Sequence, residues 1–394
     1  MRSFDVEQRR ARLARRHHLS PAFAATSVEQ AARDLVCLHA TDPATVYLSL
    51  WARVPGFTVD DLDRALYRDR TLVKHLAMRR TLFAFPRESL PMAQAAVSDR
   101  VADSESRRLV REVEKADLFG DGAAWLAKAQ DAVLAALADG REATSTELRE
   151  EIPLLAGSFT YGVGRSWGGQ VPVGPRVLTT LSAAGRIVRA SNNGGWKTSR
   201  PSWARTECWL GAPIAELDEA TGTRELVRAW LRAFGPGTVE DIKWWLGGTL
   251  SATRRALAAL DAVEVDLDGT PGVVLPDDLE PVDPVEPWAA LLPALDPTTM
   301  GWAARDWYLG GHRAEVFDGN GNGGNTAWWD GRIVGGWHQE DGGEVVVHLL
   351  ERVDPAVRRA LDAEAGRLTE WLAGSRVAQR FPSPLTRRMA PRSR

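Results

Sequence analysis

The feature that most constrains this chain is an order of three helices followed by a β-hairpin, which recurs along the sequence. In the middle of the chain, the helical spacing of apolar residues predicts helices over 123–137, 145–152 and 173–184. A strand that opens at Arg186, an Asn-Asn-Gly-Gly turn at 192–195 and a returning strand over 196–203 predict the hairpin. Repetition of one topology favours several similar units over a single large core.

The same order is predicted on both sides of this segment. Towards the C-terminus, the pattern predicts helices over 225–234, 238–246 and 251–260, followed by strands over 263–267 and 273–275. Towards the N-terminus, it predicts capped helices over 28–38, 42–51 and 58–67 and then a helix that runs into a strand over 72–85. The sequence therefore predicts an α+β fold with about three tandem winged helix-turn-helix units.

The last part of the chain has a different texture. After Pro281 come short strand-like runs with many Trp and Gly residues, and 354–372 is typical of one closing amphipathic helix. We therefore expect a small C-terminal β-rich unit. The predicted divisions are 1–115 and 116–215 for the first two winged-helix units, the second with a long hairpin, 216–280 for the third, and 281–394 for the Trp-rich β unit with its closing helix.

Composition excludes several classes of protein. No run of eighteen apolar residues and no apolar signal core follow the Arg-rich N-terminus, so we expect a cytoplasmic protein without a membrane partner. The two cysteines, Cys37 and Cys208, are far apart, so neither a disulfide framework nor a zinc site is indicated. We expect no metal and no cofactor.

Charge is distributed unevenly. The formal net charge of −3 argues against a simple basic DNA-binding module. However, 2–16 carries six arginines, and 376–394 carries six arginines and no acidic residue. This distribution indicates a polarised molecule, although solvated termini would give the same pattern.

Cationic residues gather in the predicted second unit. In a winged helix the third helix enters the major groove and the hairpin lies along the DNA backbone, so basic residues there would touch DNA. The candidate DNA-binding residues are Arg165, Arg176, Arg186, Arg189, Lys197, Arg200 and Arg205, with Trp196 between them. The alternative is a solvated hairpin with half-buried indoles.

A polar cluster lies at the junction of the first two predicted helices. His39, Thr41 and Asp42 are the candidate catalytic residues, because a carboxylate or a held water can stabilise the oxocarbenium-like state of glycosidic bond cleavage. The alternatives are that Asp42 caps the next helix and that His39 is a packing residue. A second motif, 318–323, matches the opening of a calcium loop, but Trp329 stands where the closing Glu belongs, so we expect an Asn/Gly turn.

Three blocks of sequence resemble a known family. They are Leu35-Val36-Cys37-Leu38-His39-Ala40-Thr41-Asp42-Pro43 with Tyr47-Leu48-Ser49-Leu50-Trp51-Ala52-Arg53, then 292–302, then 320–337. Together they resemble the bacterial winged-helix superfamily that includes DNA glycosylases unhooking interstrand crosslinks, such as azinomycin-resistance glycosylases. The resemblance covers nearly the whole chain.

The resemblance implies a function as well as a fold. It implies winged-helix units around a concave DNA-binding face and a glycosylase without a metal that excises bulky N-alkylated purines or unhooks crosslinks. The expected partner is double-stranded DNA, alkylated or crosslinked, bound by a nucleoid-associated monomer. The family's catalytic Gln-x-Gln or Gln-x-Asp signature is replaced here by His39-Ala40-Thr41. A non-catalytic DNA-binding protein, such as a regulator or a lesion-binding protein, is therefore the alternative, and a small-molecule enzyme that uses the Trp-rich unit is a more distant one.

Overall fold

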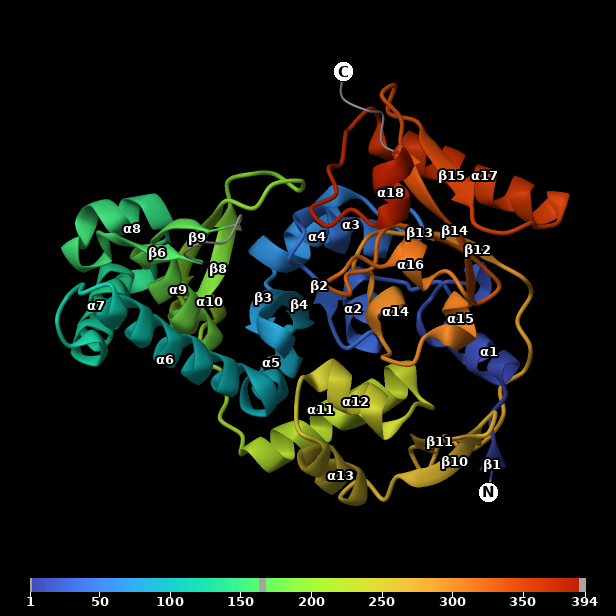
Figure 1. Cartoon of the computed structure of the whole chain (residues 1–394), viewed down its shortest axis with the longest axis horizontal. Coiled ribbons are helices and arrows are strands. Elements are labelled where there is room, and N and C mark those ends of the chain that lie inside the picture. Colours follow the sequence, from blue (N-terminus) through green and yellow to red (C-terminus); the bar gives the residue numbers. More distant parts are fainter. Residues whose placement is uncertain (1, 163–167, 390–394) are drawn as a thin grey trace.

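The computed structural model describes residues 2–162 and 168–389, which form a mixed α+β fold (Figure 1). One connection recurs in three segments of the chain: helix, short extended segment, two helices, then two antiparallel strands. In the first two segments the short strand pairs with the last strand, which lies in the middle of the sheet, and in the third segment an isolated bridge joins the short extended segment to the last strand. The recurrence that the sequence predicted is therefore also a recurrence of strand order.

The first segment begins with α2 and ends with a hairpin. Its elements are α2 (Val28–Asp34), β2 (Leu38–His39), α3 (Pro43–Trp51), α4 (Val59–Asp63) with a π-helical extension (Arg64–Arg68), β3 (Leu72–Ala77) and β4 (Thr81–Pro86). The sheet order is β2-β4-β3. The predicted helix at the start of 72–85 is wrong, because both halves are strands. Arg79 and Arg80 adopt positive φ angles of 53° and 58° at the turn between them.

The second segment lies to one side of the molecule, on the left in Figure 1. Its elements are α7 (Gly122–Ala136), β5 (Ala143–Thr144), α8 (Ser145–Glu151), α9 (Val173–Ala183), β8 (Ile187–Asn192) and β9 (Pro201–Arg205), and β6 (Ser158–Tyr161) and β7 (Gly169–Pro172) are inserted before α9. The returning strand begins later than predicted. Asn192 donates its side-chain amide to the carbonyls of Gly195 and Thr198, and this folds the intervening residues into a loop.

The third segment incorporates the N-terminus of the chain. Its elements are α11 (Glu219–Phe234), α12 (Val239–Leu246), α13 (Leu250–Ala258), β10 (Val263–Leu267) and β11 (Thr270–Val274). Gly237 bridges Val273 of β11 in the place of a first strand. On the other edge, β1 (Arg2–Ser3) pairs in parallel with β10. The first residues of the chain thus contribute to a sheet more than 250 residues away in sequence.

The C-terminal part is a four-stranded antiparallel sheet with helices around it. The strands β12 (Ala289–Leu292), β13 (Thr326–Trp329), β14 (Arg332–Gln339) and β15 (Val345–Leu349) lie in sequence order. The associated helices are α14 (Pro297–Met300), α15 (Asp306–Leu309), α16 (Arg313–Val316), α17 (Pro355–Leu372) and α18 (Pro384–Met389). Connecting helices elsewhere are α1 (Val6–Arg16), α5 (Leu90–Ala93), α6 (Asp99–Lys115) and α10 (Thr206–Leu210).

The hydrophobic core joins parts that are distant in sequence. One buried cluster contains Leu50 and Trp51 of α3 together with Val334 of β14 and Leu361 of α17. The tryptophans of the C-terminal part belong to this core or to its neighbour, since Trp302, Trp328 and Trp337 are all at most 2% exposed. Their burial argues against an open Trp-lined site for a small-molecule enzyme.

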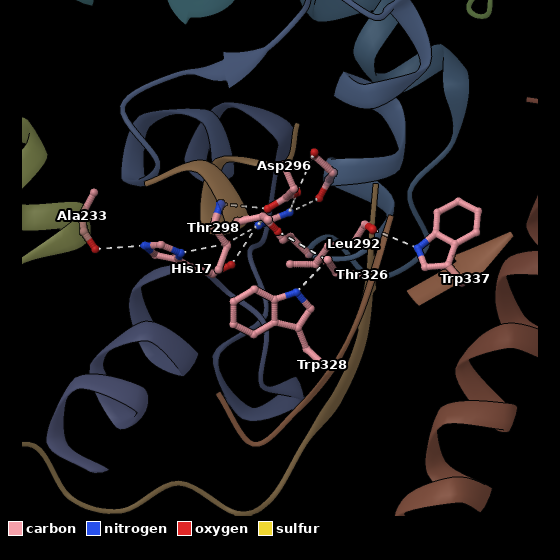
Figure 2. A network of polar contacts seen from close by, with 11 residues as sticks. His17, Ala233, Leu292, Asp296, Thr298, Thr326, Trp328 and Trp337 are labelled. Atoms are coloured by element: carbon pink, nitrogen blue, oxygen red, sulfur yellow. Dashed lines mark hydrogen bonds and ion pairs between the residues drawn. The ribbon is translucent and has the colours of Figure 1, made fainter. Parts of the chain in front are cut away.

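A buried polar network holds α1, α3, α11 and α14 together (Figure 2). The guanidinium of Arg53 donates to both carboxylate oxygens of Asp296, at 2.7 and 2.9 Å, and to the hydroxyl of Thr298. His17 contacts Thr298 through Nδ1 and the carbonyl of Ala233 through Nε2. Burial lowers the pKa of His17 well below its usual value, so the neutral ring accepts from Thr298 and donates to Ala233.

The Arg-rich N-terminal segment also has a structural role. Arg12 and Arg16 both bind the carboxylate of Asp278, at 2.6 Å, and Arg10 donates to the carbonyl of Trp307. These arginines attach α1 to the rest of the molecule, so they do not form the free cationic edge that the charge distribution indicated. No described helix is long and apolar enough to cross a membrane.

Candidate functional site

A pocket of about 650 Å³ lies where the first and third segments meet the C-terminal part. Its lining combines His39 of β2, residues of the β3–β4 turn, Trp244 of α12 and the loop that precedes β13. The lining residues are His39, Arg79, Thr81, Trp244, Met300, Ala303, Arg305, Arg313, Gly319, Asn320, Gly321 and Asn322. One of the three candidate catalytic residues, His39, is among them.

His39 lies on β2, opposite Phe83 of β4. The imidazole makes an edge contact with the ring of Phe83, with centroids 5.1 Å apart, and only 8% of the residue is exposed. Its Nδ1 atom is buried and has no hydrogen-bond partner among the described residues. Burial, assisted by the nearby cation of Arg79, lowers the pKa of His39 to about 3. The ring is therefore neutral at physiological pH and has one unused nitrogen.

Three arginines give the pocket its charge. The guanidinium of Arg79 lies 4.1 Å from the ring centre of Trp244, and that of Arg305 lies 4.7 Å from the same ring. Arg305 also lies over Phe317, at 4.3 Å, and Arg313 approaches Phe317 from 5.8 Å. Among the described residues, none of the three arginines forms an ion pair with a carboxylate. We call Arg79, Trp244, Arg305, Phe317 and Arg313 the arginine–aromatic column.

The loop over 318–323 forms one wall of the pocket. The carboxylate of Asp318 accepts the backbone N–H groups of Asn320 and Asn322, at 2.8 and 2.9 Å, and the side-chain amide of Asn322. These bonds lower the pKa of Asp318 although burial opposes them. The loop therefore forms an Asn/Gly turn. No group of three or more potential metal-ligating side chains occurs in 2–162 or 168–389.

The contacts of Thr41 and Asp42 differ from those expected of catalytic residues. Thr41 accepts the backbone N–H of Leu82 at 3.3 Å. The carboxylate of Asp42 accepts the N–H of Ala44, as the N-cap of α3, and the N–H of Arg380. Asp42 lines a separate cavity of about 20 Å³, and burial raises its pKa. This geometry favours the capping alternative for Asp42.

The candidate DNA-binding residues do not form one surface. Arg176 pairs with Glu105 at 3.2 Å, and Arg205 pairs with Glu207 at 2.5 Å. Arg189 lies over the ring of Trp203, and burial lowers its pKa to about 10. Pairing and burial therefore occupy three of the predicted cations.

The remaining candidates lie on or near the β8–β9 hairpin. Arg186, Lys197 and Arg200 are exposed, and Arg189 and Arg200 line a second pocket of about 490 Å³. Arg165 lies outside the described residues. Trp196 does not stand free for base stacking, because its ring packs against Tyr47 of α3 and Trp371 of α17, each at 5.5 Å. The hairpin loop consequently reaches from the second segment to the rest of the molecule (Figure 1).

Sequence reasoning missed the cations of the pocket. Arg79 was placed inside a predicted helix, and Arg305 and Arg313 stand in a segment where only Trp and Gly drew attention. A usable signal was present in the loop over 318–323, which the sequence singled out and which forms a wall of the same pocket. However, no local pattern in the sequence shows that the first segment, the third segment and the C-terminal part meet in space.

Comparison with known families decides where the chain belongs. The family model described as DNA glycosylase AlkZ-like matches residues 32–371, which include His39 and the whole column. The chain belongs to the AlkZ-like DNA glycosylase family. The match spans most of the described chain of this AlkZ-like protein, and it confirms the resemblance that the sequence blocks indicated.

A solved structure gives the same fold. The AlkZ-like chain superposes on the Streptomyces sahachiroi DNA glycosylase AlkZ with a TM-score of 0.73, at 20% sequence identity, covering 96% of this chain and 99% of that one. At this identity the likeness concerns the fold. A comparison with curated protein sequences gives no significant match.

Proposed function

We propose that this AlkZ-like protein is a DNA glycosylase that hydrolyses the N-glycosidic bond of bulky N-alkylated or crosslinked purines in duplex DNA. The observation that carries the proposal is the position of His39. It stands at the first position of the family's catalytic signature, and it lines a cationic pocket between the first segment, the third segment and the C-terminal part. Membership of a DNA glycosylase family supports the same reaction class.

The reaction does not require an acid from the protein to protonate the departing base. An alkylated purine with a quaternised ring nitrogen carries a positive charge, so it leaves as a neutral base when the C1′–N bond breaks. A water then supplies the hydroxyl at C1′, and its proton passes to solvent or to a nearby acceptor. A neutral imidazole can hold that water through a lone pair, as the glutamine of the family signature can hold it through its amide oxygen. We assign this role to His39, with Thr41 positioning the turn beside it.

The fold would serve this reaction by holding duplex DNA. We propose that the three recurring segments are winged-helix units, divided from one another and from the Trp-rich β unit near residues 115, 215 and 280. The exposed cations Arg186, Lys197 and Arg200 would then contact phosphates from the second unit. We further propose that the protein acts as a monomer on the DNA of the nucleoid and requires no metal or cofactor.

A duplex with a single N7-alkylguanine tests the proposal. Abasic sites are scored for the wild-type protein, His39→Ala and His39→Gln, with His348→Ala as a matched control that removes a half-buried imidazole from β15, outside the pocket. We expect excision by wild type, a loss of roughly a hundredfold in His39→Ala, since positioned proton acceptors contribute at least that much, and recovery in His39→Gln.

The outcomes separate the alternatives. Salt-sensitive binding of duplex without excision by any form would contradict the proposal and favour a non-catalytic DNA-binding protein. Equal excision by wild type and His39→Ala would retain the reaction and remove His39 from it. An equal loss in His348→Ala would show that the effect of His39→Ala is on folding.

A further inference from the structure

The arginine–aromatic column has the features of a binding site for an anion. Its three guanidinium groups come from the β3–β4 turn, from the loop after α14 and from α16, and they converge on one pocket. Cations that a fold needs for its own stability are normally paired, as Arg53 is with Asp296. Those of the column have no carboxylate partner in the described part of the chain, since they lie over aromatic rings, and Arg79 and Arg305 donate only to uncharged groups such as the carbonyls of Trp244 and Trp302.

Like charges are crowded in the column. Burial lowers the pKa of Arg79 to about 10, and the cation of Arg305 lowers it further in the same direction. Burial also lowers the pKa of Arg305, and Arg313 adds to that effect. A guanidinium group keeps its proton in proteins at neutral pH. An anion in the pocket would relieve the repulsion and replace the water that the buried Arg305 has lost.

Some of the donors around the pocket are already used within the protein. The backbone N–H groups of Asn320 and Asn322 already bind Asp318. Arg305 is 3% exposed, donates its Nε to the carbonyl of Trp302 at 2.6 Å and also hydrogen-bonds the side chain of Tyr308, so only part of its donor capacity is left for a ligand. His39 lines the same pocket, and its Nδ1 atom is buried without a hydrogen-bond partner among the described residues, so a buried polar group near the column is left unsatisfied by the protein.

We propose that the arginine–aromatic column is a clamp for one backbone phosphodiester of the DNA strand whose nucleotide faces His39. The identity of the anion as a strand phosphate rests on the proposed function, whereas the cationic site itself does not. Arg79 and Arg313 are exposed at the rim, and Arg305 is buried behind them, so the rim pair would meet the phosphate first. The flat faces of Trp244 and Phe317 keep the three guanidinium planes in place without neutralising them.

Binding of undamaged duplex DNA tests the clamp without any dependence on excision. We expect Arg79→Gln and Arg313→Gln each to weaken binding roughly tenfold, as the loss of one charge-assisted hydrogen bond would, and to reduce the slope of log Kd against log salt by up to about one. Arg359→Gln is the matched control, because Arg359 is exposed on α17 and has no ion pair with a described residue. It should bind as wild type does.

A neutral phosphate analogue identifies the contacted group. A single methylphosphonate is moved along each strand, and wild-type binding should fall by about tenfold at one position when a clamped charge is removed. At that position the analogue should cost little in Arg79→Gln or in Arg313→Gln. Arg305→Gln is measured as well, together with its melting temperature, because substitution of the buried Arg305 can destabilise the protein. If this variant unfolds, Arg79→Gln and Arg313→Gln alone test the clamp.

Two results would overturn the clamp. One is an equal effect of the methylphosphonate in wild type and in both rim variants. The other is displacement of the duplex by millimolar inorganic phosphate or a mononucleotide at constant ionic strength, which would assign the pocket to a free phosphate. Clamp behaviour with no excision of an alkylated base would contradict the proposed function alone, so the two failures are distinguishable.

Discussion

Arg53 and Asp296 form a bidentate ion pair in which both side chains are completely inaccessible to solvent. The pair connects α3 with the start of α14, 243 residues away in sequence. Ser49 donates a third hydrogen bond to Asp296 at 2.7 Å, so neither carboxylate oxygen depends on water. Such a pair is costly to break from one side, since the surviving charge stays buried without a partner.

We therefore expect Asp296→Asn to lower the free energy of unfolding by about 3–5 kcal/mol. Urea denaturation followed by tryptophan fluorescence measures this difference. Arg358→Ala, which removes an exposed i,i+4 partner of Asp362 on α17, is the control and should cost less than about 1 kcal/mol. A loss as small as the control's in Asp296→Asn would contradict the view that this pair holds the segments together.

This pair also shows how two of the sequence blocks are joined in the fold. The block that ends in Trp51-Ala52-Arg53 and the block over 292–302 meet in the Arg53–Asp296 network. Arg53 and Asp296 thus give these two blocks a role in holding the fold together. A resemblance based on them identifies the architecture, and it leaves the chemistry to His39-Ala40-Thr41, which departs from the family signature.

Local patterns predicted most helices and the order of elements. The helix over 145–152 and the strand over 263–267 lie within one residue of α8 and β10, because capping residues and alternating apolar residues act over a few positions. The start of the hairpin over 72–86 was missed because its apolar residues, at positions 72, 73, 76 and 77, have a spacing that also occurs in a helix, whereas the strand buries His75 and leaves Lys74 and Leu76 half-buried.

The charges of the site could not be predicted in this way. The Arg-rich segment over 2–16 looked like a nucleic-acid surface, but Arg12 and Arg16 bind Asp278. The column, by contrast, uses single arginines from separate parts of the chain. Whether an arginine is paired depends on which segments meet, and that information is absent from the local sequence.

The pH dependence of stability provides a second prediction, because His39 has a pKa of about 3 in the folded protein against 6.5 for an ordinary His. Between these values the unfolded chain binds a proton that the folded protein does not, so stability falls as pH falls below 6.5. From pH 7.5 to 5.0, wild type should lose about 2 kcal/mol more than His39→Gln, which cannot titrate.

Urea denaturation at the two pH values measures this difference. Thr81→Val is the control, because Thr81 lines the same pocket without titrating, and it should follow the wild-type pH dependence. Parallel curves for wild type and His39→Gln would mean that the pKa of His39 is the same in the folded and the unfolded protein, so that the pocket does not hold the ring in its neutral form below pH 6.5.

The contact of Trp196 with Tyr47 and Trp371 gives a third prediction, on local opening of the hairpin loop. Trp196→Ala removes two aromatic contacts, each worth about 0.5–1.5 kcal/mol, and leaves the loop after Asn192 without its anchor. We expect tryptic cleavage after Lys197 to become roughly tenfold faster, since cleavage follows the population of the opened loop.

Mass spectrometry of timed digests identifies the cleaved bond. Phe119→Ala is a suitable control, since Phe119 is an exposed aromatic residue stacked on Trp125, 4.6 Å away, in another part of the second segment. Unchanged cleavage after Lys197 in Trp196→Ala would show that the hairpin is held by other contacts.

Asp42 gives the prediction that separates capping from chemistry at the start of α3. Its carboxylate accepts two backbone N–H groups, from Ala44 and Arg380, and it lines a cavity separate from the pocket of His39. Asp42→Asn keeps an oxygen for the cap, so excision of an alkylated base should stay within roughly threefold of wild type, against the hundredfold or more that loss of a catalytic carboxylate would cause.

Asp42→Ala loses both acceptors and should lower the free energy of unfolding by about 1 kcal/mol, the usual cost of an N-cap, with excision again near the wild-type rate. A hundredfold loss of excision in Asp42→Asn, with its melting temperature unchanged, would return Asp42 to the reaction. The carboxylate would then have to leave its two N–H donors to reach the substrate. Binding of DNA would have to drive this movement, because none of the described contacts of Asp42 favours it.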